Sequence, residues 1–195
     1  MARSKSAIKK LKYIVTAHHE DDQIENFIEM DLPKNINLAI SLLGGDISLN
    51  DIQGESMIET LGGDIKIINH KGRIETKTNG GDIETEMING TLKAHSFGGR
   101  INILRSKGNL SSSSIGGDIR METLHGIIDS QTSGGYINMK DITATEINCK
   151  SSGGTINCNK ISGNIKIKNA GEGIYLSLIH ISEPTRQEAI SYAVF

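Results

Sequence analysis

A short glycine-rich unit, Gly-Gly-Asp-Ile, returns along most of this 195-residue chain at a nearly constant interval. The interval is eighteen residues at every step except one, where it is nineteen. The copies begin at Gly44, Gly62, Gly80, Gly98, Gly116, Gly134, Gly153 and Gly171, and the last copy is degenerate. A short constant period is the sequence pattern of a solenoid, in which each repeat packs on the next. The chain is therefore expected to form a stack of like coils.

Positions within the repeat are numbered here from 1 to 18, starting at the first glycine of each copy. Position 4 is Ile in all eight copies, from Ile47 to Ile174. Positions 13 and 15 are apolar or small in the middle repeats, with Ile74, Leu92, Leu110 and Ile128 at the former and Thr76, Ala94, Ser112 and Ser130 at the latter. Because alternate side chains of a strand point the same way, each coil is predicted to carry two short strands that face one core. The predicted fold class is all-β, a single-stranded parallel β-solenoid, and crossover chirality favours right-handed winding.

The polar and glycine positions predict the bends. Glycine at positions 1, 2 and 11 is interpreted as allowing backbone dihedrals that other residues avoid. Asp46, Asp64 and Asp82 form a column at position 3. Asp is a favoured turn residue because its carboxylate bonds local backbone N–H groups. The alternative is a calcium site, but the glycine-rich calcium-binding nonapeptide has a different acid spacing, so no metal ligand is assigned.

The residues before the repeats predict a separate lead-in, which divides the chain into 1–32 and a solenoid over 33–175. Residues 2–12 are predicted to form a short helix with a lysine-rich, solvated face. Residues 13–17 and 24–32 are predicted to be the two strands of a β-hairpin. The turn between them contains His18-His19-Glu20-Asp21-Asp22. A metal site is the alternative there, but adjacent side chains of a strand point to opposite faces, so a solvated turn is favoured.

The last twenty residues, 176–195, do not continue the repeat. The strings LSLIHISEPTR and ISYAVF resemble the translation of sequencing-adapter DNA, with residues 187–189 in place of a sample index. This segment is interpreted as an adapter-derived tail and is excluded from fold reasoning. An amphipathic cap on the solenoid is the alternative interpretation.

Composition argues against two classes of protein. The formal net charge is −2, whereas most nucleic-acid-binding proteins have a strongly basic surface, so this class is disfavoured. The sequence has no run of eighteen apolar residues that would predict a transmembrane helix. The N-terminal segment also lacks the sustained apolar stretch of a secretion signal.

Cys149 and Cys158 are the two cysteines, and they fall on neighbouring coils. The extra residue of the nineteen-residue coil is placed within residues 143–146, which puts both cysteines at inward positions. Two buried thiols are favoured over a disulfide. Catalytic thiol chemistry would need a nearby base, and no histidine is aligned with either cysteine.

The remaining candidates for chemistry do not converge in the sequence pattern. His70, His95 and His125 occupy different columns. The charged residues Lys66, Glu84, Glu86 and Arg120 are interpreted as a solvated surface, scattered over several faces with opposite charges adjacent. No catalytic, cofactor-binding or metal-binding residue is assigned, no cofactor is expected, and the chain is predicted not to be an enzyme.

Two stretches carry a family resemblance: DLPKNINLAISLLGGDISLNDIQG and GGDIKIINHKGRIETKTNGGDI. Together with the upstream ARSKSAIKKLKYIVTAHHEDD, they resemble the prokaryotic family of adhesin-like β-solenoid domains. The resemblance spans residues 2–175. It implies a non-catalytic domain that is often exported or associated with the cell envelope, and it defines no catalytic residues.

Three functions remain as hypotheses. The leading one is a structural or adhesive module at the cell envelope, with a surface, glycan or protein as its partner. The second is a scaffold that polymerises end to end, as bactofilin filaments do, through strand edges at the solenoid ends. The third is a carbohydrate-acting β-helix enzyme, for which the sequence shows no convergent cluster of acids.

Overall fold

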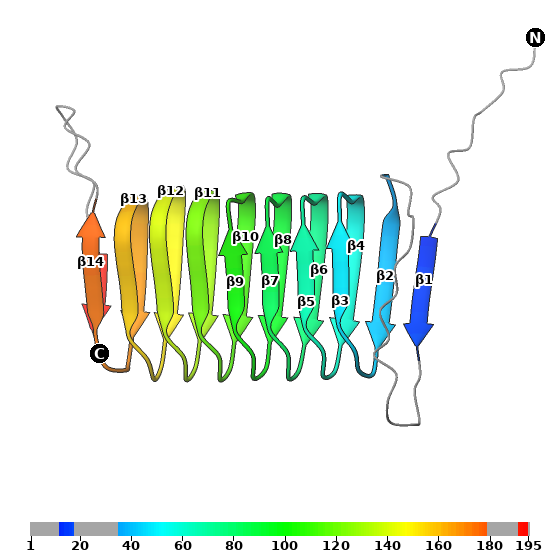
Figure 1. Cartoon of the computed structure of the whole chain (residues 1–195). Helices are drawn as coiled ribbons and strands as arrows, with labels where there is room; N and C mark the ends of the chain where they lie inside the picture. Colours follow the sequence, from blue (N-terminus) through cyan, green and yellow to red (C-terminus); the bar gives the residue numbers. More distant parts are fainter. Residues whose placement is uncertain (1–11, 18–34, 179–190, 195) are drawn as a thin grey trace, which may run out of the picture.

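The protein is a stack of parallel strands wound into a β-solenoid of about eight turns (Figure 1). The computed structural model describes residues 12–17, 35–178 and 191–194. The strands are β1 Lys12–Ala17, β2 Asn37–Leu42, β3 Ile47–Asn50, β4 Gln53–Thr60, β5 Ile65–Ile68, β6 Lys71–Thr78, β7 Ile83–Glu86, β8 Asn89–Ser96, β9 Ile101–Leu104, β10 Lys107–Ser114, β11 Ile119–Thr132, β12 Ile137–Ser151, β13 Ile156–Asn169, β14 Ile174–Leu178 and β15 Ser191–Val194. The predicted all-β parallel solenoid is confirmed.

Each strand pairs with its counterpart one coil away, as the eighteen-residue period requires. Ile65 is opposite Ile83, and Gly72 is opposite Gly90. Two walls result. We call β3, β5, β7, β9, β14 and the first parts of β11, β12 and β13 wall A, and we call β2, β4, β6, β8, β10 and the later parts of β11, β12 and β13 wall B. Two corners join them: the glycine corner at positions 17, 18 and 1–3 (for example residues 78–82), and the lysine corner at positions 8–12 (for example residues 69–73).

The core lies between the walls and is built from the columns that the sequence pattern predicted. The position 4 isoleucines Ile65, Ile83, Ile101, Ile119 and Ile137 are fully buried. Leu92, Leu110 and Ile128 at position 13 of wall B are buried as well. One coil alone would leave these side chains in water on both sides, so the stack is the stable unit.

Glycine is needed at this solenoid's bends for two different reasons. At position 11 the backbone has a positive φ, such as 119° at Gly72 and 143° at Gly90, which side chains disfavour. At position 2 the requirement is space, because a Cβ atom on Gly81 would collide with the carbonyl oxygen of Gly63. At position 1 neither reason holds in the middle coils, since the nearest atom to a Cβ on Gly80 would be 3.8 Å away, whereas a Cβ on Gly171 in the last copy would lie 2.6 Å from Gly153. The prediction that glycine at positions 1 and 2 is needed for its dihedrals is therefore wrong, except at Gly45, where φ is 94°.

A second strained position was not predicted from the sequence. Position 8, at the lysine corner, has a positive φ in seven coils without glycine: Asp51, Asn69, Met87, Arg105, Thr123, Asp141 and Lys160. Asn and Asp tolerate this left-handed conformation, whereas a β-branched residue such as Thr does so at a cost. Because the residue type at position 8 differs from coil to coil, the sequence does not indicate that this position has a positive φ.

The nineteen-residue coil accommodates its extra residue as a bulge. Pairing shifts between Ala144 and Glu146, which leaves Thr145 without an opposite residue in β11. The Thr145 hydroxyl donates a hydrogen bond of 3.1 Å to the carbonyl oxygen of Gly126. The extra residue therefore lies within residues 143–146, as predicted. From Glu146 onward, β12 again pairs residue by residue with β11.

At the two ends the sheet extends past the regular repeats. β1 pairs in parallel with β2, so the predicted first strand is confirmed but belongs to wall B. The proposed hairpin partner, residues 24–32, and the predicted helix at 2–12, apart from Lys12 in β1, lie outside the described residues, as do His18 and His19. At the other end, β14 continues through residues 176–178, and β15 pairs with β13 in parallel.

Candidate functional site

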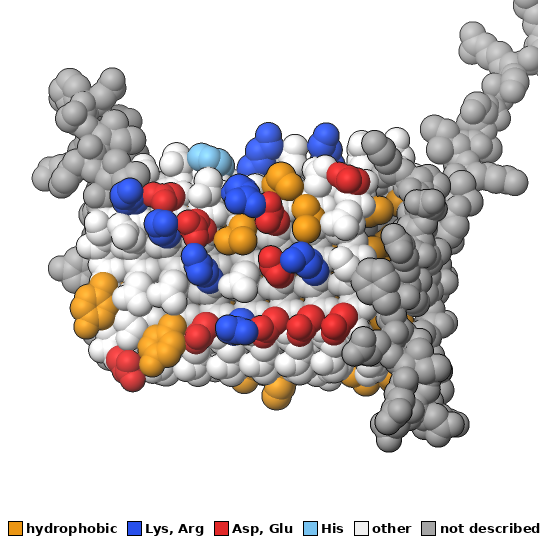
Figure 2. All heavy atoms as spheres, viewed as in Figure 1, with side chains coloured by type: hydrophobic (Ala, Val, Ile, Leu, Met, Phe, Trp, Pro, Cys, Tyr) orange, Lys and Arg blue, Asp and Glu red, His pale blue; other side chains and the backbone are white. Residues whose placement is uncertain are grey.

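The aspartate column at position 3 forms a hydrogen-bonded ladder along the glycine corner (Figure 2). Oδ1 of Asp46 accepts from the backbone N–H of Asp64 at 2.7 Å, and Oδ1 of Asp64 accepts from the N–H of Asp82 at the same distance. Asp118 accepts from the N–H of Tyr136 at 2.8 Å. The expectation of a local turn contact is therefore wrong, because each carboxylate bonds the next coil. The ladder ties coils together and has a structural role.

Arg100 takes the place of aspartate in the middle of this column. Its backbone N–H donates to Oδ1 of Asp82 at 2.7 Å, and its Nη2 donates to Oδ2 of the same carboxylate at 2.8 Å. The guanidinium relieves repulsion between like charges one coil apart. This pair is exposed, so its contribution to stability is small.

A buried hydroxyl column behind the glycine pair completes the corner and was not predicted from the sequence. Thr78 Oγ1 donates to the carbonyl oxygen of Gly63 at 3.0 Å and accepts from the N–H of Gly81 at 3.2 Å. Ser96 makes the same two bonds to Gly81 and Gly99. Position 17 is Thr, Ser or Asn in every coil: Thr60, Thr78, Ser96, Ser114, Thr132, Ser151 and Asn169. That uniformity was the available signal, because buried hydroxyl groups need partners.

The charged residues of the middle coils gather on the outer face of wall A. Lys66, Glu84 and Arg120 share position 5, and Glu86 lies at position 7 of the same wall. The interpretation that these residues scatter over several faces is wrong, because positions 5 and 7 point outward together. Opposite charges are adjacent, as expected: Lys66 Nζ lies 3.4 Å from Glu84 Oε2, and Arg105 pairs with Glu86.

A shallow groove crosses wall A over β9. It has a volume of about 340 Å³ and is lined by Glu84, Asn102, Leu104, Arg105, Arg120, Glu122 and Thr123. The groove forms because the side chain of Asn102 is shorter than those of Glu84 and Arg120, which hold the same position in the coils on either side. A half-buried Leu104 lies next to polar and charged groups, a combination that suits a ligand with both apolar and hydroxyl-bearing surface.

Glu122, at the rim of this groove, is held ionised by its neighbours. Arg120 donates to it at 2.8 Å and Lys140 at 3.0 Å, and these contacts lower the pKa of the Glu122 carboxyl. The same Glu122 contact raises the pKa of the Lys140 ammonium. A carboxyl of lowered pKa is already ionised near neutral pH and is a weaker base, so these groups fit recognition better than acid–base catalysis.

The cysteines are buried free thiols, as predicted. Burial raises the pKa of the Cys158 thiol to about 12 and raises that of Cys149 well above its ordinary value. Cys149 Sγ lies 3.5 Å from Met139 Sδ in the core. Neither thiol has the exposure or the thiolate character of a nucleophile.

His70 is a fully buried polar residue in an otherwise mainly apolar column. Its Nε2 lies 3.1 Å from the Ser56 hydroxyl, whereas its Nδ1 has no hydrogen-bond partner within the described part of the chain. Burial lowers the pKa of His70 from 6.5 to about 4. His95 and His125 lie on other columns, as expected, so the three imidazoles do not converge.

The described residues contain no group of three or more His, Cys, Asp or Glu side chains arranged to hold a metal ion. No helix in the described part of the chain has the length and apolar character needed to cross a membrane. Comparison of the chain with family models, with curated proteins and with solved structures finds no match.

Proposed function

We propose that this protein is a non-catalytic, adhesin-like β-solenoid module that presents a rigid patterned surface at the cell envelope, with the wall A groove as its contact site for a glycan or protein. The observation that carries the proposal is the groove over Asn102 and Leu104, where a short outward residue opens the otherwise tightly paired surface. The neighbouring ion pairs hold Arg105, Arg120 and Glu122 in place. A ligand would therefore meet a preformed site, which reduces the entropy cost of binding.

The chemistry of the surface supports recognition over catalysis. The groove holds one acidic side chain on each flank, and Glu122 is committed to Arg120 and Lys140. The buried Cys149, Cys158 and His70 are separated from the groove by the wall itself, because they point to the core side. A hydrolytic site would require a nucleophile or base with access to solvent.

Binding to immobilised glycans and to isolated envelope fractions tests this proposal. Asn102→Lys would fill the groove floor, and binding is expected to fall at least about tenfold because the contact surface is blocked. Asn148→Lys is the matched control, since it adds the same side chain to a half-buried site on wall B, where Lys93 and Lys166 hold the same position. Failure of the unmodified protein to bind any of these surfaces, or equal binding by both variants, would refute the proposal.

End-to-end polymerisation is a second candidate, favoured by the first coil. Among the described residues β3 pairs with β5 alone, and no described residue pairs with its other edge. Such an edge can accept a strand from another molecule. Electron microscopy of the concentrated protein would show filaments with the solenoid axis along their length if this candidate is right.

A further inference from the structure

The glycine corner exposes a row of large apolar side chains that the fold does not use. Position 18 carries Leu43, Leu61, Phe97 and Ile115, whose exposed fractions are 47%, 44%, 58% and 42%, and Asn79 holds the same position between Leu61 and Phe97. Position 18 lies three residues before the acidic position 3 along the chain. Figure 2 shows apolar side chains at the lower edge of the molecule, below the acidic row. Side chains of this size that remain in water along one line are typical of an interaction surface.

The flanking charge restricts what this row can contact. Asp46, Asp64, Asp82 and Asp118 run beside it, with Arg100 as the one cation in the column. An anionic lipid surface would be repelled by this row. A protein partner that combines apolar groups with cations would be attracted to it.

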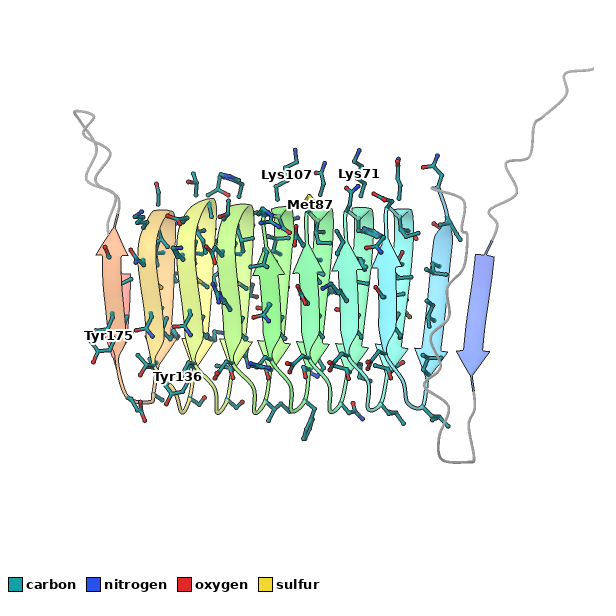
Figure 3. The ribbon with its side chains drawn as sticks, in the orientation of Figure 1. Lys71, Met87, Lys107, Tyr136 and Tyr175 are labelled. Atoms are coloured by element: carbon teal, nitrogen blue, oxygen red, sulfur yellow. The ribbon has the colours of Figure 1, made fainter. Side chains whose placement is uncertain are left out.

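The lysine corner of the same molecule has these properties. In the four middle coils, residues 69–73, 87–91, 105–109 and 123–127, it contains four Lys or Arg residues and no acid, whereas the coils on either side carry Asp51, Glu55 and Asp141. Lys71 and Lys107 project from this corner on either side of Met87, whose exposed fraction is 42% (Figure 3). Neither lysine forms an ion pair with any residue that the structure describes.

We propose that the protein associates side by side with a second copy of itself, the lysine corner of one molecule lying against the apolar and acidic glycine corner of the next. The spacing matches, because Lys71 and Lys107 lie two coils apart and so do Asp82 and Asp118. Both separations are set by the same coil rise of about 4.8 Å. In this register Met87 is level with Phe97, and Asn79 and Ile115 lie one coil away on either side of Phe97.

The contact joins two different corners, so it is heterologous. Each molecule in a pair keeps one free corner of each kind, and association continues into an open sheet of parallel solenoids. The row from Leu43 to Ile115 spans five coils, or about 24 Å along the solenoid. A contact along one narrow edge of this length buries less surface than a standard protein interface, so a single contact is weak and depends on concentration. This inference does not rest on the wall A groove, and it differs from end-to-end stacking because no strand edge takes part.

Sedimentation velocity over a range of protein concentrations tests the proposal. The unmodified chain is expected to show a sedimentation coefficient that rises with concentration and falls again in high salt, because added ions screen the corner charges. Lys71→Gln with Lys107→Gln is expected to lower the association constant at least about tenfold. Gln53 and Asn89 hold the same position in neighbouring coils, so this variant keeps the fold. Lys93→Gln with Lys150→Gln removes equal charge from wall B and is expected to change nothing.

A mixing experiment separates the heterologous contact from other forms of association. Phe97→Ser with Ile115→Ser removes the apolar row, and Ser133 and Ser152 show that the solenoid accepts Ser at that position. This variant keeps its lysine corner, whereas the double-Gln variant keeps its glycine corner. Each alone is expected to stay monomeric, and an equal mixture is expected to stop at one-to-one dimers. Monomeric behaviour of the unmodified chain at all concentrations, or no dimer in the mixture, would overturn the proposal.

Discussion

Acidification is expected to destabilise this solenoid through His70, the buried imidazole beside Ser56. The imidazole is neutral in the folded chain because burial lowers its pKa from 6.5 to about 4. Its Nδ1 has no partner among the described residues, so a proton added there would place an unpaired charge in the core. The unfolded chain has no such penalty and takes up the proton near pH 6.5.

The sign and size of the effect follow from this difference. Between pH 6.5 and pH 4 the unfolded state binds more protons than the folded state, so stability is lost as the pH falls through that window. Each pKa unit corresponds to about 1.4 kcal/mol, and the two values therefore give a loss of about 3 kcal/mol from His70 between pH 7 and pH 4. Such a loss is a large part of the total stability of an ordinary domain.

Urea unfolding of the unmodified chain and of His70→Ile, at pH 7 and pH 4, measures this contribution. Ile52 and Ile88 occupy the same column, so isoleucine fits the site. Surface carboxylates titrate equally in both proteins, and the difference between the two unfolding free energies isolates His70. That difference is expected to shift by about 3 kcal/mol in favour of the variant at low pH. An unchanged difference, or the same shift in the exposed control His125→Asn, would refute the reasoning.

Three further predictions concern the backbone and the core. Gly81→Ala is expected to cost about 3 kcal/mol or more, because its Cβ would strike the coil below, whereas Gly80→Ala is expected to be nearly neutral by thermal unfolding. Thr123→Asn is expected to raise the unfolding free energy by about 0.5–1 kcal/mol, since Asn tolerates the positive φ at that position better than a β-branched residue; a lower melting temperature would contradict the assigned strain. Cys149 and Cys158 are expected to resist a thiol reagent in the folded protein and to react after denaturation, as mass spectrometry would show.

The sequence period predicted most of the fold but little of the surface. The isoleucine column at position 4 fixed which face of each strand is buried, and the bulge near Thr145 followed from one nineteen-residue interval. The wall A groove was missed because it arises where Asn102 lies between longer side chains one coil away on each side. The groove becomes visible only when Glu84, Asn102 and Arg120 are placed side by side at one position of wall A, because they are eighteen residues apart in the chain.

The Gly-Gly-Asp-Ile repeat by itself determined a parallel solenoid, its register and its core columns, because equal spacing forces like residues to stack. Only the tertiary structure shows which contact requires each residue type at the glycine corner. The Asp82 carboxylate bonds the next coil, Gly81 is required by the approach of Gly63, and Thr78 holds two coils together through one hydroxyl. These contacts join residues about one period apart, and their atoms meet only when the coils are stacked at strand spacing.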